Sequence, residues 1–332
     1  MSITVVGSIA YDAVRTPFGE RERMLGGAAV HFALAASFFA DVHVVGPVGD
    51  DFGEEQLDVM RRRGVDVSDV ERVAGGRTFF WRGEYGWDLN SRETLDTQLG
   101  VFEGFEPKLS ESSRSSDVLF LANIQPELQR AVRAQMPDAR FVALDSMNLW
   151  IDTARESLVR AIESVDCVIL NDAELRQLTG KPSLVSAARE ILSWAPGSGA
   201  GSGGGPTVVV AKQGEYGAAL VTRTGFFALP AYPLESVIDP TGAGDTFAGG
   251  LVGYIAAQLE GAGEDGAGAG PRELNEALLR RAMAHATVLA SFNVEEFGTE
   301  RVERLTGAEI EARIAELQAM TQFSGAPLEL RG

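Results

Sequence analysis

The chain has 332 residues, of which 45% are hydrophobic, so it is long enough to bury a large core. Its formal net charge is −18, with 47 acidic against 29 basic residues, and no run of Lys and Arg could follow a phosphate backbone. These features exclude a disordered or fibrous chain and argue against nucleic acid and anionic membrane as partners.

The first residues of the chain, MSITVVGSIAYD, predict a β-strand rather than a targeting segment. They have no basic segment ahead of the apolar run, no long hydrophobic region and no small-residue cleavage site. No stretch approaches the roughly 20 apolar residues that a membrane-spanning helix requires. The single cysteine, Cys167, falls in an apolar run that suits a buried strand in a reducing compartment. We therefore expect a soluble, cytoplasmic protein without an internal disulfide or a catalytic thiol.

Short apolar runs alternate along the chain with segments of helical spacing. The apolar runs are predicted to be strands at 2–6, 42–45, 117–122, 140–144, 166–170 and 207–211. The helical segments lie at 27–40, 53–63, 153–163, 185–194, 242–259 and 272–291. Because the runs are almost wholly apolar rather than alternating, they are typical of parallel strands buried on both faces. The sequence therefore predicts an α/β fold with a doubly wound, mostly parallel sheet flanked by helices.

One region, residues 77–103, departs from this rhythm. Its side chains alternate between apolar and polar, include aromatic residues and turn formers, and lack helical periodicity. We expect a small antiparallel lobe, either a lid that closes over a site or a simple surface hairpin. The Gly-rich tracts 196–206 and 261–270 are predicted to be flexible surface loops. The expected organisation is one domain over 1–322, with the lobe inserted, and a C-terminal tail at 323–332.

The segment VIDPTGAGDTFAGGLVGYIAAQL, residues 237–259, carries the most specific chemistry. A turn of small residues from Thr241 to Gly244 leads into an apolar helix, with Asp245 in its first turn. Backbone amides at a helix N-terminus attract anions, and small side chains let a phosphate come close. A carboxylate there would repel the phosphate, unless it takes a proton from the hydroxyl that attacks that phosphate. The alternative is an ordinary strand–turn–helix junction in which the aspartate complements the helix dipole.

This segment resembles the C-terminal signature of the phosphofructokinase B (PfkB) family, the ribokinase-like carbohydrate and nucleoside kinases. In that family the motif D[TP]TGAGD forms an anion hole and supplies a catalytic base, and DPTGAGD fills every position of it in this chain. The resemblance implies that Gly242, Ala243 and Gly244 donate hydrogen bonds to the anion and that Asp245 is the base. It extends over essentially the whole chain, because the other family landmarks follow in order.

Two landmarks near the N-terminus resemble the acceptor-binding elements of the family. VVGSIAYD (5–12) is similar to the family's first strand, which ends in an aspartate that binds substrate hydroxyls, and this implies that Asp12 lies in the site. LGGAAVHFALAASFFADVHVVGPVGDDFG (25–53) is similar to its N-terminal signature, in which a glycine pair, Gly26 and Gly27, lets the backbone approach the substrate. Without the family pattern, Asp12 would be a solvated loop residue and the glycine pair a turn.

Two later landmarks resemble elements that handle the metal and the nucleotide. NDAE (171–174) matches the NxxE motif associated with Mg²⁺ and phosphate, so the resemblance places Asn171 and Glu174 near the metal, in its outer shell. The alternative is that Asn171 only caps a helix and Glu174 lies in its first turn. KQGEYGA (212–218) resembles the glycine-containing turn beside the nucleotide, which implies that Lys212 and Gly214 approach the phosphates or ribose of ATP.

One position departs from the family pattern. The motif GGxxxN places an asparagine on a sugar hydroxyl, whereas this chain has His31 there. A histidine can still donate or accept a hydrogen bond, but it is larger and a partner must set its tautomer. The change puts a simple ribose or fructose acceptor in doubt and leaves room for a nucleoside base; the alternative is a packed helix residue. Weaker matches are Asp145 with Asn148, spaced one residue wider than the family's DxN, and Ala290 and Asn293 at the expected adenine pocket.

Together with the resemblance, these residues predict an ATP-dependent kinase that phosphorylates a hydroxyl of a small sugar. The implied cofactors are ATP and Mg²⁺, with a monovalent cation near Asp239, and the implied assembly is a homodimer formed through the lid. A nucleoside kinase of the same fold is the nearest alternative, and a non-catalytic ligand-binding descendant is a distant one. A dinucleotide-dependent oxidoreductase is disfavoured, because GxGxxG is absent after Val6.

Overall fold

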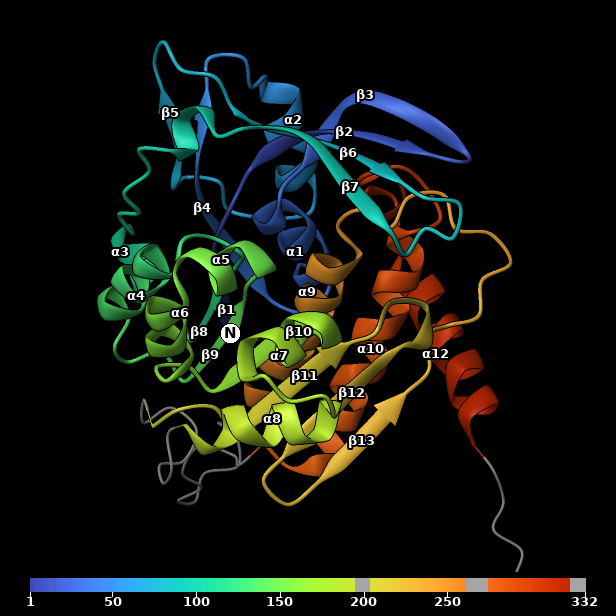
Figure 1. Cartoon of the computed structure of the whole chain (residues 1–332). Coiled ribbons are helices and arrows are strands. Elements are labelled where there is room, and N and C mark those ends of the chain that lie inside the picture. The colour runs from blue at the N-terminus through green and yellow to red at the C-terminus, as the bar shows by residue number, and fades with distance from the viewer. Residues whose placement is uncertain (195–203, 261–273, 323–332) are drawn as a thin grey trace, which may run out of the picture.

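The computed structural model describes residues 1–194, 204–260 and 274–322, and a nine-stranded sheet forms its centre (Figure 1). The strand order is β13-β12-β11-β10-β9-β8-β1-β4-β5. Neighbours from β11 to β5 pair in parallel, and the antiparallel strands β12 and β13 extend one edge. This confirms the predicted mostly parallel α/β fold. The bounds are β1 Ser2–Val6, β4 Asp41–Gly49, β5 Val70–Val73, β8 Val118–Leu121, β9 Phe141–Asp145, β10 Cys167–Asn171, β11 Val208–Lys212, β12 Ala218–Thr222 and β13 Phe226–Leu229.

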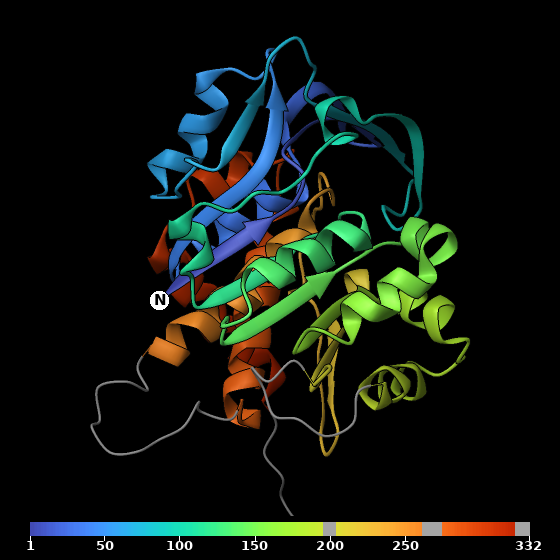
Figure 2. The same ribbon diagram turned by 90° about the vertical axis from the view of Figure 1, so that its left-hand side faces the viewer.

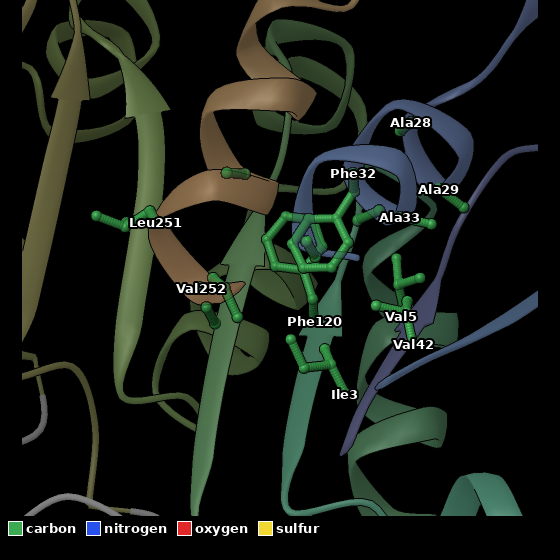
Figure 3. Packing of buried hydrophobic residues seen from close by; sticks show 14 of the residues in the cluster. Ile3, Val5, Ala28, Ala29, Phe32, Ala33, Val42, Phe120, Leu251 and Val252 are labelled. Atoms are coloured by element: carbon green, nitrogen blue, oxygen red, sulfur yellow. The ribbon is translucent and has the colours of Figure 1, made fainter. Parts of the chain in front are cut away.

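Helices cover both faces of this sheet (Figure 2). On one face Val5 and Phe120 pack against α1, α9 and α10, and Phe32 stacks on Phe120 with ring centroids 4.1 Å apart (Figure 3). On the other face the adjacent residues Val6 and Leu121 pack against α4, α6, α7 and α8. Two cores form because successive residues of a strand point to opposite sides. The helix bounds are α1 Ala28–Ala36, α2 Glu54–Arg62, α3 Glu111–Arg114, α4 Pro126–Gln135, α5 Asn148–Thr153, α6 Arg155–Ile162, α7 Asp172–Thr179, α8 Leu184–Ser193, α9 Ala243–Glu260, α10 Glu276–Asn293, α11 Glu300–Glu303 and α12 Gly307–Thr321.

A second, four-stranded sheet is set off from the first, at the top of Figure 1, and is called the lid below. Its order is β3-β2-β6-β7, with bounds β2 Ala10–Thr16, β3 Gly19–Gly26, β6 Phe79–Tyr85 and β7 Arg92–Gln98. The β6–β7 pair is the antiparallel lobe predicted within 77–103. That prediction was incomplete, because β2 and β3 from the N-terminal region complete the lid and β2 pairs with β6 in parallel. The first strand therefore ends at Val6, and Asp12 lies on β2 of the lid rather than at the end of that strand.

The predicted helices are present with shifted ends. The helix predicted over 27–40 ends at Ala36, and the one predicted from 272 begins at Glu276. The β12–β13 hairpin and helices α4 and α12 were missed, whereas α7 is the helix that the alternative interpretation of NDAE contained. In α12 only Ile310 and Leu317 are buried among 15 residues, which leaves a weak periodic signal. The tracts 261–270 and 323–332 and most of 196–206 lie outside the described residues. Among the helices that are described, none has the length and hydropathy to cross a membrane.

Candidate active site

Residues 241–244, which run from a turn into the first two residues of α9, form the predicted anion-binding turn. Gly242 has a φ of +74°, and a Cβ added there would lie 2.3 Å from Cε1 of His31, so this position requires glycine. A Cβ on Gly244 would lie 3.1 Å from Nζ of Lys212, so a cation stands beside the turn. The Ala243 amide donates to the carbonyl oxygen three residues earlier at 3.2 Å, so the turn itself uses this predicted donor. The first amides of a helix have no partner within the helix, so the amides at the start of α9 and the Lys212 ammonium group together suit an anionic ligand.

Asp245 lies partly buried in the first turn of α9, among charged groups from other elements. Burial, followed by the negative charge of Asp145, raises its pKa to about 7, whereas Lys212 and Arg92 act to lower it. A carboxylate with a pKa near neutrality can take and release a proton at physiological pH. This position therefore combines a potential general base with an anion-binding turn.

Asp12 on β2 is buried and faces the same group of charges. Burial, followed by the charges of Asp239 and Asp245, raises its pKa to about 7, so residues far apart in the sequence meet at one site. A Cβ on Gly26 would lie 2.0 Å from Oδ2 of Asp12, and the Gly27 amide hydrogen-bonds the same carboxylate. Gly27 has a φ of +99° and is the N-cap of α1. The structure thus brings the predicted acceptor-binding aspartate and glycine pair together within electrostatic reach of the predicted base.

Asn171 and Glu174 form a capping box at the start of α7. The Glu174 amide donates to Oδ1 of Asn171 at 2.7 Å, and the Asn171 amide donates to Oε2 of Glu174 at 2.8 Å. Burial raises the pKa of Glu174 to about 7, although Lys212 acts to lower it. At the end of the adjacent strand β11, Nζ of Lys212 lies 2.7 Å from Oδ2 of Asp145. No group of three His, Cys, Asp or Glu side chains within the described ranges could hold a metal ion by itself.

His31 lies inside the fold, behind the anion-binding turn, with 2% of its surface exposed. Its Nδ1 lies 3.1 Å from Oδ1 of Asn293, which also accepts from Oγ1 of Thr246 at 2.9 Å, while Nδ2 of Asn293 donates to O of Thr241 at 2.7 Å. Since Oδ1 can only accept, Nδ1 carries the proton of the imidazole. Burial lowers the pKa of His31 to about 4, so the ring is neutral near pH 7. Its Nε2 is buried and has no partner among the described residues.

The remaining predicted residues occupy separate places around this site. Asp239 is fully buried; it accepts from the Thr241 amide at 2.9 Å and the Gly298 amide at 3.0 Å, and burial raises its pKa. Asn148 begins α5, and Ala290 on α10 packs against the core that contains α1 and α9. Of these residues, Asp239 supports the anion-binding turn directly, through its bond to the Thr241 amide.

Two lid residues that the sequence analysis did not single out contact the site. Tyr85, at the end of β6, is buried and its hydroxyl accepts from Oγ1 of Thr241 at 3.2 Å. In the β6–β7 turn, Nδ2 of Asn90 donates to Oε1 of Glu215 at 2.8 Å, next to Gly214, whose φ is +57°. The alternation of β6 could have marked Tyr85 as an inward residue, but no local signal marks Asn90. The lid therefore reaches both the anion-binding turn and the turn after β11.

Three comparisons place the chain among known proteins. Residues 2–304 match the model of the pfkB family of carbohydrate kinases. A cytidine kinase of Thermococcus kodakarensis is 31% identical over 262 residues, 76% of this chain and 88% of that protein, and a fructokinase of Klebsiella pneumoniae is 26% identical over 275 residues, 77% and 84%. The structure of ribokinase from Giardia lamblia has a TM-score of 0.75 at 18% identity, over 95% of this chain and 98% of that one.

The fold and the match along the chain define a phosphotransferase that acts on hydroxyl groups of sugars or nucleosides. The chain belongs to the PfkB family of carbohydrate kinases. The family assignment from the motif DPTGAGD is thereby confirmed, whereas the roles of the individual site residues remain predictions.

Proposed function

We propose that this chain is an ATP-dependent kinase that phosphorylates a hydroxyl of a small sugar. The observation that carries the proposal is the position of Asp245, in the first turn of α9, directly after the anion-binding turn and within electrostatic reach of Lys212. The negative charge of a carboxylate in this place weakens the binding of a phosphate, so we expect the carboxylate to have a chemical task in the reaction. Deprotonation of a hydroxyl that attacks the phosphate is such a task.

In the proposed reaction the acceptor lies beside Asp12, which accepts hydrogen bonds from its hydroxyls, while Gly26 and Gly27 let it approach the backbone. Asp245 takes the proton of the attacking hydroxyl, and the oxygen of that hydroxyl forms a bond to the γ-phosphorus. The bond between this phosphorus and the bridging oxygen breaks, and ADP leaves with the electron pair. Lys212 and amides of the anion-binding turn stabilise the charge on the phosphoryl oxygens. Asp245 then releases its proton to solvent.

The cation requirements of the proposed reaction follow from the donor groups. Asn171 and Glu174 satisfy each other in the capping box, so they suit an outer-shell role, with Mg²⁺ held by phosphates and water. When bound, Mg²⁺ would neutralise charge on the phosphates of ATP. The buried carboxylate of Asp239, next to the anion-binding turn, suits a monovalent cation. The positive φ of Gly214 suits a close approach of its backbone to the nucleotide.

A nucleoside acceptor is the second candidate, and the 31% identity to a cytidine kinase favours it. Both candidates present a sugar hydroxyl to the same base, so they differ in what surrounds that sugar. Release of ADP from ATP, measured with ribose, fructose, cytidine, adenosine and inosine in parallel, tests the proposal. Turnover of a free sugar supports the first candidate, and turnover of nucleosides alone supports the second. Absence of turnover with every acceptor, and with ATP shown to bind, would contradict a kinase acting on either class.

His31 is the residue most suited to change the choice of acceptor. The unpartnered Nε2 beside the anion-binding turn gives it a hydrogen-bonding atom that a ligand can use. We expect His31→Asn to redistribute kcat/KM among sugars and nucleosides and to leave the KM for ATP nearly unchanged. A lost hydrogen bond to a hydroxyl can change discrimination by as much as about 10⁴-fold, compared with about 10–200-fold for a lost apolar contact.

The matched control for this variant is His43→Asn, because His43 lies on β4 and pairs with Asp66 at 3.2 Å, and it makes none of the contacts described for the site. It should leave the ranking of acceptors as it is. If His31→Asn lowers the Tm but keeps that ranking, His31 is a packed helix residue and has no contact with the acceptor.

A further inference from the structure

Arg92 is the first residue of β7, at the end of the lid where Tyr85 touches the anion-binding turn. The two residues are partners across the β6–β7 ladder, so their side chains lie on the same face of the lid. The Arg92 guanidinium lies over the Trp81 ring, 5.3 Å from its centroid, and Nε1 of Trp81 donates to Oγ1 of Thr94, the next residue on that face of β7. Arg92 is exposed, so this face presents a cation at the lid surface.

Two hydrogen bonds hold the lid near Arg92. The Tyr85 hydroxyl accepts from Thr241 at the start of the anion-binding turn, at 3.2 Å. Asn90, two positions before Arg92, donates to Glu215 in the turn after β11, at 2.8 Å. One contact lies where the proposed γ-phosphate binds, and the other lies where the rest of the nucleotide is proposed to bind. Arg92 is close to both contacts in the lid, as the ladder partner of Tyr85 and two residues after Asn90.

The site that this cation faces is rich in carboxylates. Lys212 is engaged by one of them at 2.7 Å. The positive charge of Arg92 acts on three other carboxylates of the site, since it lowers the pKa of Asp12, Glu174 and Asp245. A bound triphosphate adds further negative charge to the site. The lid arginine supplies a positive charge that offsets part of it. The carboxylates of the site are Asp12, Asp145, Glu174, Asp239 and Asp245.

We propose that Arg92 is a catalytic residue that the lid brings to the phosphoryl group during transfer. The inference rests on the proposed kinase function. As the bond from the acceptor oxygen to phosphorus forms and the bond to ADP breaks, negative charge spreads over the three remaining oxygens of that phosphorus. The guanidinium donates hydrogen bonds to these oxygens, forms no covalent bond and keeps its protons. It therefore stabilises the transition state more than either bound substrate.

A negatively charged acceptor is the other ligand that a lid arginine could hold. The acceptor side of the site argues against it, because Asp12 lies there under the influence of Asp239 and Asp245. An acid or phosphate group in that place would meet repulsion from all three carboxylates. The structure therefore favours an uncharged acceptor and leaves the phosphoryl group as the ligand of Arg92.

The test compares the wild type with Arg92→Met, Arg92→Lys and Arg82→Met, using ATP and the best uncharged acceptor of the panel. Arg82 is the matched control, since it is an exposed lid arginine on β6 that pairs with Glu20 at 3.2 Å. We expect Arg92→Met to lower kcat by about 100-fold or more, with little change in either KM. Arg92→Lys should recover part of the loss, and Arg82→Met should behave as the wild type.

The pH profile gives a second readout that a structural role would not change. The charged groups that face Asp245 are Asp12, Asp145, Lys212 and Arg92. Loss of the Arg92 charge lets the pKa of Asp245 rise further, so the acidic limb of kcat/KM should move to higher pH in Arg92→Met. Unchanged kcat in this variant, or a raised acceptor KM with unchanged kcat, would overturn the proposal. A wild type that turns over no acceptor would instead overturn the proposed kinase function.

Discussion

Replacing Asp245 by Asn is expected to lower kcat by about 10²–10⁴-fold, which corresponds to about 3–5 kcal/mol. The amide has the shape of the carboxylate but cannot accept the hydroxyl proton, and the anion-binding turn is left in place. ATP should bind no more weakly than to the wild type, because a negative charge beside the phosphate is removed. Steady-state kinetics with the best acceptor of the panel and calorimetric titration with ATP measure the two effects separately.

The same carboxylate should give activity and stability opposite dependences on pH. The base must be ionised and its pKa is about 7, so kcat/KM should rise with pH and level off above that value. The folded-state pKa lies above the ordinary value of 3.8, so the stability linked to this group falls as pH rises between these two values. Asp245→Asn should therefore be more stable than the wild type near pH 8, by roughly 1–3 kcal/mol after discounting its partial exposure.

The control for this variant is Asp58→Asn, because Asp58 is exposed on α2 and pairs with Arg61 at 2.9 Å. It should change neither the turnover nor the pH profile. If Asp245→Asn retains turnover close to that of the wild type, another group removes the proton and the assignment of the base is wrong.

The central sheet was predictable because its strands are buried on both faces and leave apolar runs in the sequence. The run at 166–170, for example, appears as β10 Cys167–Asn171, paired in parallel on both sides. The lid was only half predictable, since β3 reads GERERMLG and carries four charged residues in the middle of a strand. Its place in the lid depends on β2, which pairs with β6 across a long separation in sequence. A local pattern does not contain such pairings.

The candidate site, like the fold, was predictable only where a local sequence pattern marks it. The DPTGAGD motif identified Asp245 and the anion-binding turn, because a turn of small residues followed by an acidic helix start has a local chemical meaning. Arg92 and Tyr85 could not be assigned in this way, because their role depends on where the lid rests. The hydrogen-bond partner of His31 could not be predicted from the sequence either, because the contact with Asn293 joins α1 to the end of α10.

Lys212→Met is expected to destabilise the fold by about 3–5 kcal/mol near pH 8, because it leaves a buried carboxylate without its cation. Nζ of Lys212 lies 2.7 Å from Oδ2 of Asp145, and the two side chains are 19% and 5% exposed. After the substitution, the Ser146 amide at 2.8 Å would still donate to Asp145. Glu174 and Asp245 also act on Lys212, so its loss makes their protonation easier as well.

This loss of stability should decrease as pH falls. Burial raises the pKa of Asp145 above its ordinary value even with Lys212 present, and removing the lysine raises it further. The folded-state pKa then lies further above the unfolded one, so the variant loses stability as pH rises and regains it as the carboxyl is protonated. Denaturant unfolding of the wild type and the variant at about pH 5 and pH 8 measures the difference.

Adding Asp145→Asn to Lys212→Met separates the structural role of the lysine from its contact with phosphate. The double variant has no unpaired charge at this position, so it should recover most of the lost stability. Its KM for ATP should stay raised, roughly tenfold or more, because the positive charge beside Gly244 is still missing. Lys181→Met is the control, since Lys181 is 47% exposed and pairs with Glu190 at 3.9 Å. A double variant with the KM of the wild type would show that Lys212 supports the fold and does not bind the nucleotide.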